Sequence, residues 1–569
     1  MWNWTSGRLA SNLIVPKTAF VLFLALVLVR VALPATIGTN GAIATVHPLA
    51  THAAIEAVRK GGNAVDAAVA AALTLGVVDG HNSGIGGGCF FLIRTERGAI
   101  VAIDGREAAP AGASRDMFIR DGKAVPELSQ TGALAVGIPG SLAVYDYALR
   151  HFGKLKLKDH LLPAAQLART GFPIDRAYAS RLQEASEELA QFSESRRVFL
   201  KERAAPYKEG EVLKQPDLAR TYQLIAEQGT DWFYKTEFPK AVERWMRENG
   251  GLIAAGDFQK YEIRIREALR TRYRDYEIIG FPPPSSGGVH VAQILNILEQ
   301  FELANYPAYS ADSIHLIAEA MKLAFADRAF WLGDPEFARV PRGIISRQYA
   351  QELAKQISLE KSAAVPAHGP ADQFGTAAFG KHTTHFSAAD ADGNWVACTT
   401  TVNTSFGSKV VIPGTGVIMN NQMDDFSAQP GAANYFGLVG AEANAVAPGK
   451  RPLSSMSPTI VLHSGKPILS LGAAGGPTII SQTIVNLINL LDYKMPLDKA
   501  LSSSRLHHQW RPDELRTEYL PQEVQNDLGR RGHKPVDVGR SGAAQIVFKT
   551  DRGFEAAHDP RVQGKAAGW

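Results

Sequence analysis

The stretch TTHFSAADADGNWVACTTTVNTSFG, residues 383–407, decides the fold. Its first part, 383–390, reads as a strand, Asp392-Gly393 as a hairpin turn, and 395–403 as the partner strand. The preceding tract, 359–382, is small, polar and rich in Gly and Pro, without periodicity. This composition predicts a surface loop that is open to peptide cleavage. A flexible tract is therefore expected to end where a hydroxyl-bearing strand begins.

Thr383 is the candidate nucleophile at this junction. A single Thr at a strand start has little meaning alone, because Thr is a common strand residue. Its hydroxyl needs a base, and the α-amine of the same residue can be that base once the residue begins a chain. An α-amine has a pKa of about 7.7–8.0, so it accepts a proton near neutral pH. This chemistry requires cleavage of the bond between His382 and Thr383.

Length and composition restrict the function classes. The chain has 569 residues, of which 45% are apolar, so it can bury a large core. Its 60 Lys and Arg balance 56 Asp and Glu without long blocks of one sign, which argues against a nucleic-acid partner. Two cysteines, Cys89 and Cys398, are too few for a disulfide framework or a cysteine-based zinc site, and their apolar surroundings predict buried thiols.

The N-terminal segment, residues 1–36, predicts export. Two basic residues and no acidic ones precede an apolar run, 19–29, which fits a signal peptide and is too short to span a bilayer unaided. Ala35 suits a cleavage site, whereas Leu33 does not, so an uncleaved signal anchor is the alternative. We expect a periplasmic protein, or one that is anchored in the membrane and faces outside the cytoplasm.

The rest of the chain mixes helices and strands. Two Ala-rich helices are expected within 47–79, followed by a glycine-rich loop at 82–88. Residues 140–260 read as mostly helical. The turn at 281–288 leads into another helix, and the apolar spacing over 314–325 predicts one more buried helical face.

Seven motifs in a fixed order are highly specific as a set. They are GGNAVDAAVAAALTLGVVDGHNSGIGGG (61–88), DGREAAP (104–110), PPPSSGG (282–288), the stretch 383–407, NNQMDDFS (420–427), RPLSSMSPT (451–459) and GAAGGP (472–477). Through these motifs, nearly all of the chain beyond the N-terminal segment resembles the γ-glutamyltransferase (glutathione hydrolase) family of N-terminal-nucleophile hydrolases. The resemblance implies an α/β (α+β) fold, a four-layer αββα sandwich, and neither a metal nor an organic cofactor.

The resemblance also implies the processing and the catalytic residues. The precursor would cleave its own His382–Thr383 bond and give a large subunit, 37–382, and a small subunit, 383–569, that begins with the catalytic Thr383. Thr401 matches the Thr whose hydroxyl contacts the nucleophile. Gly475 and Gly476 match the oxyanion hole, where glycine lets backbone N–H groups approach the oxygen without obstruction by a Cβ.

Six positions match the family's substrate-binding residues. They are Arg106, Asn403, Gln422, Asp425, Ser454 and Ser455. A γ-glutamyl group carries an α-ammonium and an α-carboxylate, so a specific site needs opposite charges held apart. Arg106 offers a planar fork for the carboxylate, and the two serines add hydroxyl donors. Asp425 is expected to pair with the ammonium, with the two amide side chains supplying carbonyl acceptors.

Several other signals have ordinary interpretations. The glycines after Gly84 follow a predicted helix rather than a strand, so we expect a packing turn near the site and no dinucleotide loop. His507-His508 is expected to be a structural pair rather than a metal site. His385, close to the nucleophile, either orients it or packs in the core. Phe436 stands where the family usually has Tyr, in a segment, 428–446, that resembles a lid loop; the ring can cover the pocket, but the hydroxyl contact is lost.

The expected reaction is acyl transfer in two steps. The γ-glutamyl group of glutathione or a related compound would form an ester with Thr383, which water or the amine of an amino acid or dipeptide would then cleave. Two alternatives are an acylase of the same fold that acts on glutaryl or cephalosporin-type side chains, and a non-catalytic exported binding protein. Asp425 argues against the first, because those substrates lack the ammonium. Thr383, Thr401 and the glycine pair argue against the second.

Overall fold

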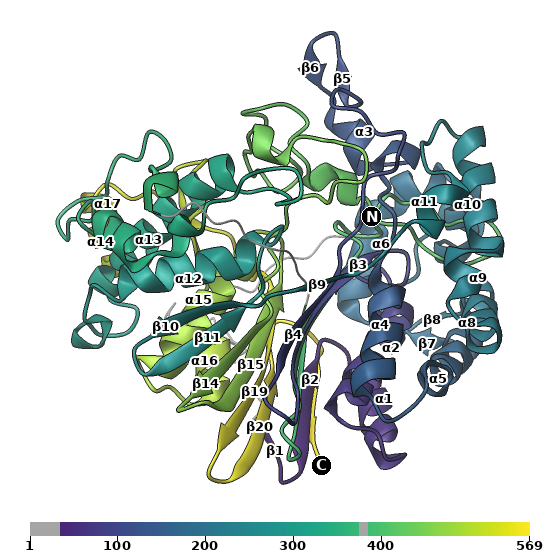
Figure 1. Cartoon of the computed structure of the whole chain (residues 1–569), viewed down its shortest axis with the longest axis horizontal. Coiled ribbons are helices and arrows are strands. Elements are labelled where there is room, and N and C mark those ends of the chain that lie inside the picture. The colour runs from purple at the N-terminus through teal and green to yellow at the C-terminus, as the bar shows by residue number, and fades with distance from the viewer. Residues whose placement is uncertain (1–34, 375–384) are drawn as a thin grey trace, which may run out of the picture.

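The computed structural model describes residues 35–374 and 385–569. Two seven-stranded sheets pack face to face, and helices cover the outer face of each sheet (Figure 1). The predicted αββα sandwich is therefore confirmed. Both sheets combine strands from before and after the junction at 375–384, so both halves of the chain are needed to build the sandwich.

All pairings within the two large sheets are antiparallel. The first sheet contains, in spatial order, β1 (Thr36–Gly38), β20 (Gly553–His558), β19 (Ala543–Thr550), β15 (Lys466–Ala474), β14 (Thr459–His463), β11 (Tyr276–Gly280) and β10 (Leu269–Tyr273). The second contains β21 (Lys565–Gly568), β2 (Gly41–Thr45), β12 (Phe386–Asp390), β13 (Trp395–Thr401), β3 (Gly88–Arg94), β4 (Ile100–Gly105) and β9 (Arg264–Arg266). Smaller sheets are formed by β5 (Ile119–Arg120), β6 (Lys123–Ala124), β7 (Phe172–Pro173), β8 (Val212–Leu213), β16 (Leu506–His507), β17 (Leu515–Thr517) and β18 (Pro535–Asp537).

Strand β3 shows why the second sheet lies between two layers. Successive strand residues point to opposite faces. Phe90 and Leu92 belong to the core shared with the first sheet, whereas Phe91 and Ile93 belong to the core beneath the helices. All four are fully buried. A strand that is apolar on both faces needs cover on both sides, and the four-layer arrangement provides it.

Helices form the two outer layers. Over the second sheet lie α1 (Pro48–Arg59), α2 (Ala64–Val78), α4 (Ser141–Phe152), α5 (Leu157–Thr170) and α8 (Pro216–Gln228), and over the first lie α12 (Ser286–Leu298), α13 (Ala311–Trp331) and α15 (Thr478–Leu491). All 15 residues of α2 are buried, and Asn63 caps the helix by accepting from the backbone N–H groups of Val65 and Asp66. The Ala-rich helix is present as predicted, and its small side chains let neighbouring layers approach closely.

The segment expected to be mostly helical carries α4 to α11. The remaining α-helices of the described ranges are α3 (Pro126–Gln130), α6 (Arg176–Ala190), α7 (Ser193–Phe199), α9 (Asp231–Tyr234), α10 (Glu237–Glu248), α11 (Ala255–Gln259), α14 (Arg347–Ala354), α16 (Leu497–Ser502) and α17 (Gln522–Arg530). The predicted helix after the 281–288 turn is α12, and the predicted buried face over 314–325 lies within α13.

The predicted hairpin is present as β12 and β13, which pair with Ala389 opposite Trp395. β13 ends at Thr401, two residues earlier than predicted, because the backbone turns there. The Asn403 backbone has φ = +83°, and its N–H donates to Thr401 Oγ1 at 2.8 Å. The start of the expected first strand, with Thr383, lies outside the described residues.

The tract before the junction is irregular, as predicted, but its described part, 359–374, is not loose. Trp510 Nε1 donates to the Val365 carbonyl at 2.7 Å, and Trp331 Nε1 donates to the Gly369 carbonyl at 3.0 Å. Asp327 Oδ1 accepts from the Gly369 N–H at 2.8 Å. Side chains distant in sequence therefore fix the path of the tract, which its composition alone does not reveal.

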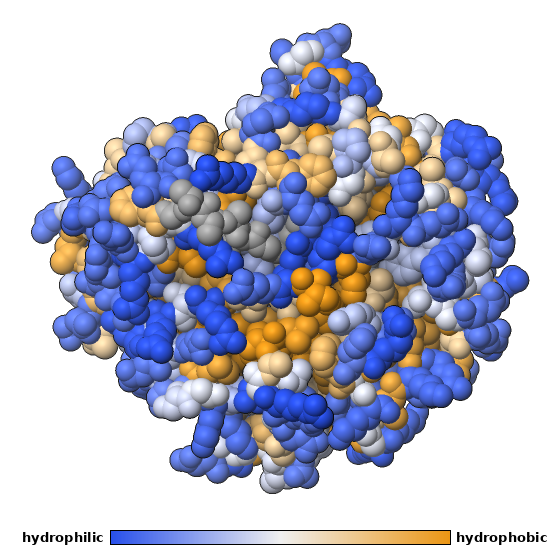
Figure 2. All heavy atoms as spheres, in the orientation of Figure 1, coloured by the Kyte–Doolittle hydropathy of each residue, from blue (hydrophilic) through white to orange (hydrophobic). Residues whose placement is uncertain are grey.

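The surface seen in Figure 2 is covered mainly by polar side chains, with an apolar area near its centre, over the region of β4 and β9 in Figure 1. Among the helices of the described ranges, none combines the length and apolar character needed to cross a membrane. The apolar run 19–29 lies outside those ranges.

Candidate active site

A cavity of about 240 Å³ opens at the ends of β13 and β15. Its walls come from seven separate segments of the chain. They include the predicted site residues Thr401, Asn403, Gln422, Asp425, Ser454, Ser455, Gly475 and Gly476. Arg106 lies directly behind Asp425, with its side chain buried. The fold thus brings together every predicted site residue that the structure describes; His382 and Thr383 fall outside the described ranges.

The glycine run beside Thr401 serves close packing. β13 pairs with β3, and Thr401 lies opposite Gly88. A Cβ on Gly87 would lie 1.8 Å from the Thr401 carbonyl oxygen, and one on Gly86 would lie 2.0 Å from the Ile418 carbonyl oxygen. The predicted role of this loop, a packing turn near the site, is confirmed.

Arg106 and Asp425 are in direct contact, so the prediction that the site holds opposite charges apart is wrong. Arg106 Nη2 donates to Asp425 Oδ2 at 2.5 Å and to the Leu453 carbonyl at 3.1 Å. Gln422 Nε2 donates to the same Asp425 oxygen at 2.8 Å. The two opposite charges satisfy each other, because an unpaired buried charge is costly.

Two buried polar atoms in this group have no hydrogen-bond partner among the described residues: the donor Arg106 Nη1 and the acceptor Gln422 Oε1. Such atoms cost about 1–3 kcal/mol each when unsatisfied. Asn403 Nδ2 donates to the Asn421 carbonyl, and no described residue bonds its Oδ1. One carboxylate and one ammonium would satisfy these atoms together, so the site is complementary to a zwitterion.

Glu107 is buried beneath Arg106, with 3.7 Å between Glu107 Oε2 and Arg106 Nη1. Burial raises the pKa of its carboxyl from 4.5 to about 7, although the Arg106 charge opposes this. A carboxyl whose pKa is raised by folding stabilises the folded state fully below pH 4.5, and that contribution falls as the pH rises to about 7.

We therefore expect the stability of Glu107→Gln, measured relative to that of the unsubstituted protein, to be greater at pH 8 than at pH 4. The difference in unfolding free energy between the two proteins should change by roughly 2–3 kcal/mol over this range. Chemical denaturation at several pH values measures it. A difference that is constant with pH would show that Glu107 does not titrate on folding in this window.

Ser454 and Ser455 lie on an extended segment that is held by the PPPSSGG motif. Ser286 Oγ donates to the Ser454 carbonyl at 2.6 Å, and Ser285 Oγ donates to the Met456 carbonyl at 2.6 Å. A Cβ on Gly287 would lie 2.2 Å from the Met456 carbonyl oxygen, which explains the glycine at that position. The motif therefore fixes the backbone that presents the two serine hydroxyls.

Arg328 is a residue of this site that sequence reasoning missed. Its Nε donates to Ser286 Oγ at 3.0 Å, and its Nη2 donates to Ser455 Oγ at 3.1 Å. Burial lowers the pKa of its guanidinium to about 10. A signal was available, because a charged residue near the end of a mostly buried helix needs a partner.

Gly475 and Gly476 follow β15 and precede α15. Their φ angles are +137° and +58°, which favour glycine. A Cβ on Gly476 would lie 2.7 Å from Phe436 Cδ1, so the predicted lid residue covers this position. Gly476 also lies at the N-terminal end of α15, where the helix dipole favours negative charge.

We expect Gly476→Ala to lower kcat by about 10- to 100-fold, since an added methyl meets Phe436 and disturbs the predicted oxyanion donors. Gly465→Ala is the matched control, because Gly465 has φ = +75° and open surroundings. Steady-state kinetics of the cleaved proteins, normalised to the cleaved chain, measures the effect. Equal losses in the two variants would show backbone strain rather than a role in catalysis.

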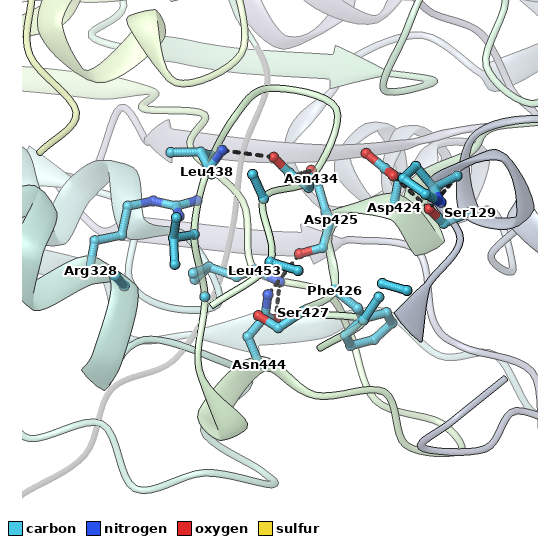
Figure 3. Close-up of a pocket in the computed structure, with 18 of the residues that line it drawn as sticks. Ser129, Arg328, Asp424, Asp425, Phe426, Ser427, Asn434, Leu438, Asn444 and Leu453 are labelled. Atoms are coloured by element: carbon cyan, nitrogen blue, oxygen red, sulfur yellow. Dashed lines mark hydrogen bonds between the residues drawn. The ribbon is translucent and has the colours of Figure 1, made fainter. Parts of the chain in front are cut away.

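The lid segment also covers a second, smaller space of about 30 Å³ next to the cavity (Figure 3). Arg328, Asp425, Asn434 and Leu438 face it. Asn434 Oδ1 accepts from the backbone N–H groups of Phe436 and Leu438, and Asp424 Oδ2 accepts from the Tyr435 N–H. The lid is thus held in place by its own side chains and by Asp424.

The three histidines singled out from the sequence, His385, His507 and His508, make structural contacts. His385 Nε2 contacts Ser387 Oγ at 2.6 Å and the Gln545 carbonyl at 3.1 Å, and burial lowers its pKa to about 3. Packing in the sheet interior is therefore the interpretation that the contacts favour. His507 and His508 are buried and bond Ser481 and Asp513, in agreement with a structural pair. Cys89 and Cys398 are buried, as predicted.

One group of potential metal ligands lies away from the cavity, formed by His315, Glu319 and His533. His315 Nδ1 and His533 Nε2 are 2.7 Å apart and share a hydrogen bond. Lys322 Nζ lies 3.0 Å from Glu319 Oε1, and Glu319 Oε2 accepts from the Ala363 N–H at 2.7 Å. The carboxylate already has a cation and donors, so the group acts as an anchor for the tract before the junction.

The fold is that of the N-terminal-nucleophile hydrolases, with the cavity at the strand ends of the sandwich. The chain aligns with the crystal structure of cephalosporin acylase from Bacillus halodurans at a TM-score of 0.84 and 26% identity, over 98% of this chain and 99% of that one. The model of the family described as Gamma-glutamyltranspeptidase matches residues 50–569.

Among curated relatives, the glutathione hydrolase proenzyme of Escherichia coli strain K12 is 42% identical over 93% of this chain and 92% of its own length. The acylase ACY 1 proenzyme of Pseudomonas sp. strain SE83 is 37% identical over 93% of both chains. The chain belongs to the gamma-glutamyltranspeptidase family.

Proposed function

We propose that this enzyme transfers the γ-glutamyl group of glutathione and related compounds through an ester on Thr383. The observation that carries the proposal is a pair of buried atoms without hydrogen-bond partners among the described residues, Arg106 Nη1 directly behind Asp425 and Gln422 Oε1 in the cavity wall. These atoms fit the carboxylate and ammonium of a γ-glutamyl group. The same cavity also contains Thr401 and the glycine pair. The named glutathione hydrolase relative supports the same donor.

The first step is processing of the precursor. The Thr383 hydroxyl attacks the carbonyl of His382, the peptide C–N bond breaks, and the α-amine is released as an ester forms. Water then hydrolyses the ester. The products are a large subunit that ends at His382 and a small subunit, 383–569, that begins with a free α-amine.

In the catalytic cycle, the Thr383 hydroxyl attacks the γ-carbonyl and its proton passes to the α-amine. The N–H groups of Gly475 and Gly476 stabilise the oxyanion. Collapse of the intermediate breaks the amide, and the α-ammonium returns the proton to the leaving amine, which for glutathione is cysteinylglycine. Thr401 holds the nucleophile: its Oγ1 accepts from the Asn403 N–H, so its own hydroxyl hydrogen is free to donate to Thr383.

The γ-glutamyl ester is then cleaved by water or by the amine of an amino acid or dipeptide. Both acceptors attack the same carbonyl, and the α-amine of Thr383 removes the proton in either case. Tyr435 is 57% exposed at the rim of the cavity and, with Phe436, gives an aromatic wall for an acceptor side chain.

An acylase for glutaryl-type side chains is the second candidate, favoured by the similarity to ACY 1 and to cephalosporin acylase. A glutaryl group keeps a carboxylate but lacks the ammonium. It would leave Gln422 Oε1 unsatisfied and would bring no cation to Asp425. The γ-glutamyl donor fits the site better for this reason.

Purified enzyme should be tested with γ-glutamyl and glutaryl p-nitroanilides, and with glutathione followed by chromatography of the products. We expect fast release of nitroaniline from the γ-glutamyl compound, slow release from the glutaryl compound, and formation of cysteinylglycine. Preference for the glutaryl compound would establish the acylase, and no release by a fully cleaved protein would support a binding protein.

We also propose that residues 1–36 direct export, so that the enzyme acts in the periplasm or is anchored facing it. The apolar run 19–29 behind a basic segment supports this. Cell fractionation, with the mass of the large subunit, distinguishes a removed signal from a retained anchor, and activity confined to the cytoplasm would contradict export.

A further inference from the structure

Arg328 is a buried cation that forms no ion pair with any carboxylate of the described residues, although the charge of Asp425 acts on it from a greater distance. The residue is 5% exposed and lies near the end of α13. Within the described ranges, no carboxylate oxygen lies within 4.0 Å of its guanidinium nitrogens. Burying a cation without an anion is costly. A ligand that brings negative charge to this side of the cavity would lower that cost.

Its hydrogen bonds set the direction of the Ser455 hydroxyl. A guanidinium can only donate, so Ser455 Oγ is the acceptor in its 3.1 Å bond to Arg328 Nη2. The hydroxyl hydrogen of Ser455 is not used in that bond, and it donates to none of the described residues. Ser455 lines the cavity, so this hydrogen is available to a bound ligand.

The hydrogen bond of Arg328 to Ser286 also has a fixed donor direction. Its Nε donates to Ser286 Oγ at 3.0 Å, and Ser286 Oγ in turn donates to the Ser454 carbonyl at 2.6 Å. One guanidinium therefore ties α13 both to the start of α12 and to the segment with the two serines. Chains of hydrogen bonds like this one polarise each other inside a protein.

We propose that Arg328 is a positioning residue for the α-carboxylate of the donor: it orients the Ser455 hydroxyl toward the carboxylate and places a positive charge behind it. This inference rests on the proposed γ-glutamyl function. It divides the recognition of the carboxylate between two arginines, with Arg106 in contact with the ligand and Arg328 acting through Ser455. Specificity for donors with an α-carboxylate would then depend on Arg328, which is not among the substrate-binding residues predicted from the sequence.

A purely structural role for Arg328 predicts a different pattern. If it only tied the helix to the serine segment, its loss would weaken turnover of every donor to a similar degree. If it acts on the carboxylate, the loss depends on whether the donor has one. The matched donors are γ-glutamyl p-nitroanilide and 4-aminobutyryl p-nitroanilide, which differ only in the α-carboxylate.

We expect Arg328→Met to lower kcat/KM for the γ-glutamyl donor by about 10- to 100-fold, mainly through KM, as for loss of a charged hydrogen bond. The value for the 4-aminobutyryl donor should change less than about threefold. Arg328→Lys keeps the charge and should recover part of the loss. Arg220→Met, on the exposed face of α8, is the control and should match the unsubstituted enzyme.

A double-mutant cycle with Ser455→Ala tests whether Arg328 acts through that serine. With the γ-glutamyl donor, kcat/KM of the double variant should be only slightly lower than kcat/KM of the more impaired single variant. Equal losses with both donors, or multiplied losses in the double variant, would overturn the proposal. If Arg328→Met is not cleaved to two chains, Arg328→Lys and Ser455→Ala decide by the same donor ratio. If the unsubstituted, cleaved enzyme does not turn over the γ-glutamyl donor, the proposed function itself is refuted.

Discussion

Thr383→Ala is expected to remain a single uncleaved chain and to lose at least about 1,000-fold in turnover of γ-glutamyl p-nitroanilide. The substitution removes the hydroxyl that attacks His382, so the α-amine is never released. It also removes the atom that would carry the γ-glutamyl ester. Denaturing gel electrophoresis measures the cleavage, and nitroaniline release measures the turnover.

Thr384→Ala is the control for this variant, since it changes the neighbouring residue of the same type. It should still be cleaved at the same bond and should keep most of its activity. Thr383→Ser keeps a hydroxyl and should be cleaved and active at a reduced rate. An uncleaved Thr383→Ala protein with near-normal turnover would contradict the role of Thr383 in catalysis.

Asp425→Asn is expected to lower kcat/KM for the γ-glutamyl donor by about 100- to 1,000-fold, the cost of removing one partner of a buried charge pair. The amide leaves the donor's ammonium without its counter-charge. It also leaves Arg106, whose Nη2 lies 2.5 Å from Asp425 Oδ2, without an anion. Steady-state kinetics with γ-glutamyl and glutaryl p-nitroanilides measures the effect, and the ratio between the two donors should shift toward glutaryl.

Asp424→Asn is the matched control, because the adjacent carboxylate points elsewhere. Asp424 Oδ1 accepts from Ser129 Oγ at 2.7 Å, and its Oδ2 accepts from the Tyr435 N–H at 3.0 Å. Its substitution should disturb the lid and change the donor ratio little. A donor ratio that is unaltered in Asp425→Asn, or altered equally in both variants, would remove Asp425 from the recognition of the ammonium.

Much of the fold follows from local sequence. The hairpin of β12 and β13 is predicted by alternation around Asp392-Gly393, and α2 is predicted by its alanines and the Asn63 cap. These features depend on neighbours in the sequence. The anchoring of 359–374 was missed, because its partners, such as Trp510 and Trp331, are far away in the sequence.

In the site, too, local sequence predicts some features, whereas others depend on residues that are distant in the sequence. The motifs identify the residues around the cavity, but they do not reveal that Arg106 and Asp425 bond each other. That contact depends on the packing of segments more than 300 residues apart in the sequence, which no single motif encodes. Arg328 was missed because its helix reads as a core helix, and only the tertiary structure places it next to Ser455.

N-terminal sequencing of purified enzyme, with the intact mass of each chain, tests the central claim most directly. The account predicts a 187-residue chain, 383–569, that begins Thr-Thr-His-Phe and appears in proportion to γ-glutamyl transfer activity. A preparation that turns over γ-glutamyl amides without any chain beginning at Thr383 would contradict it.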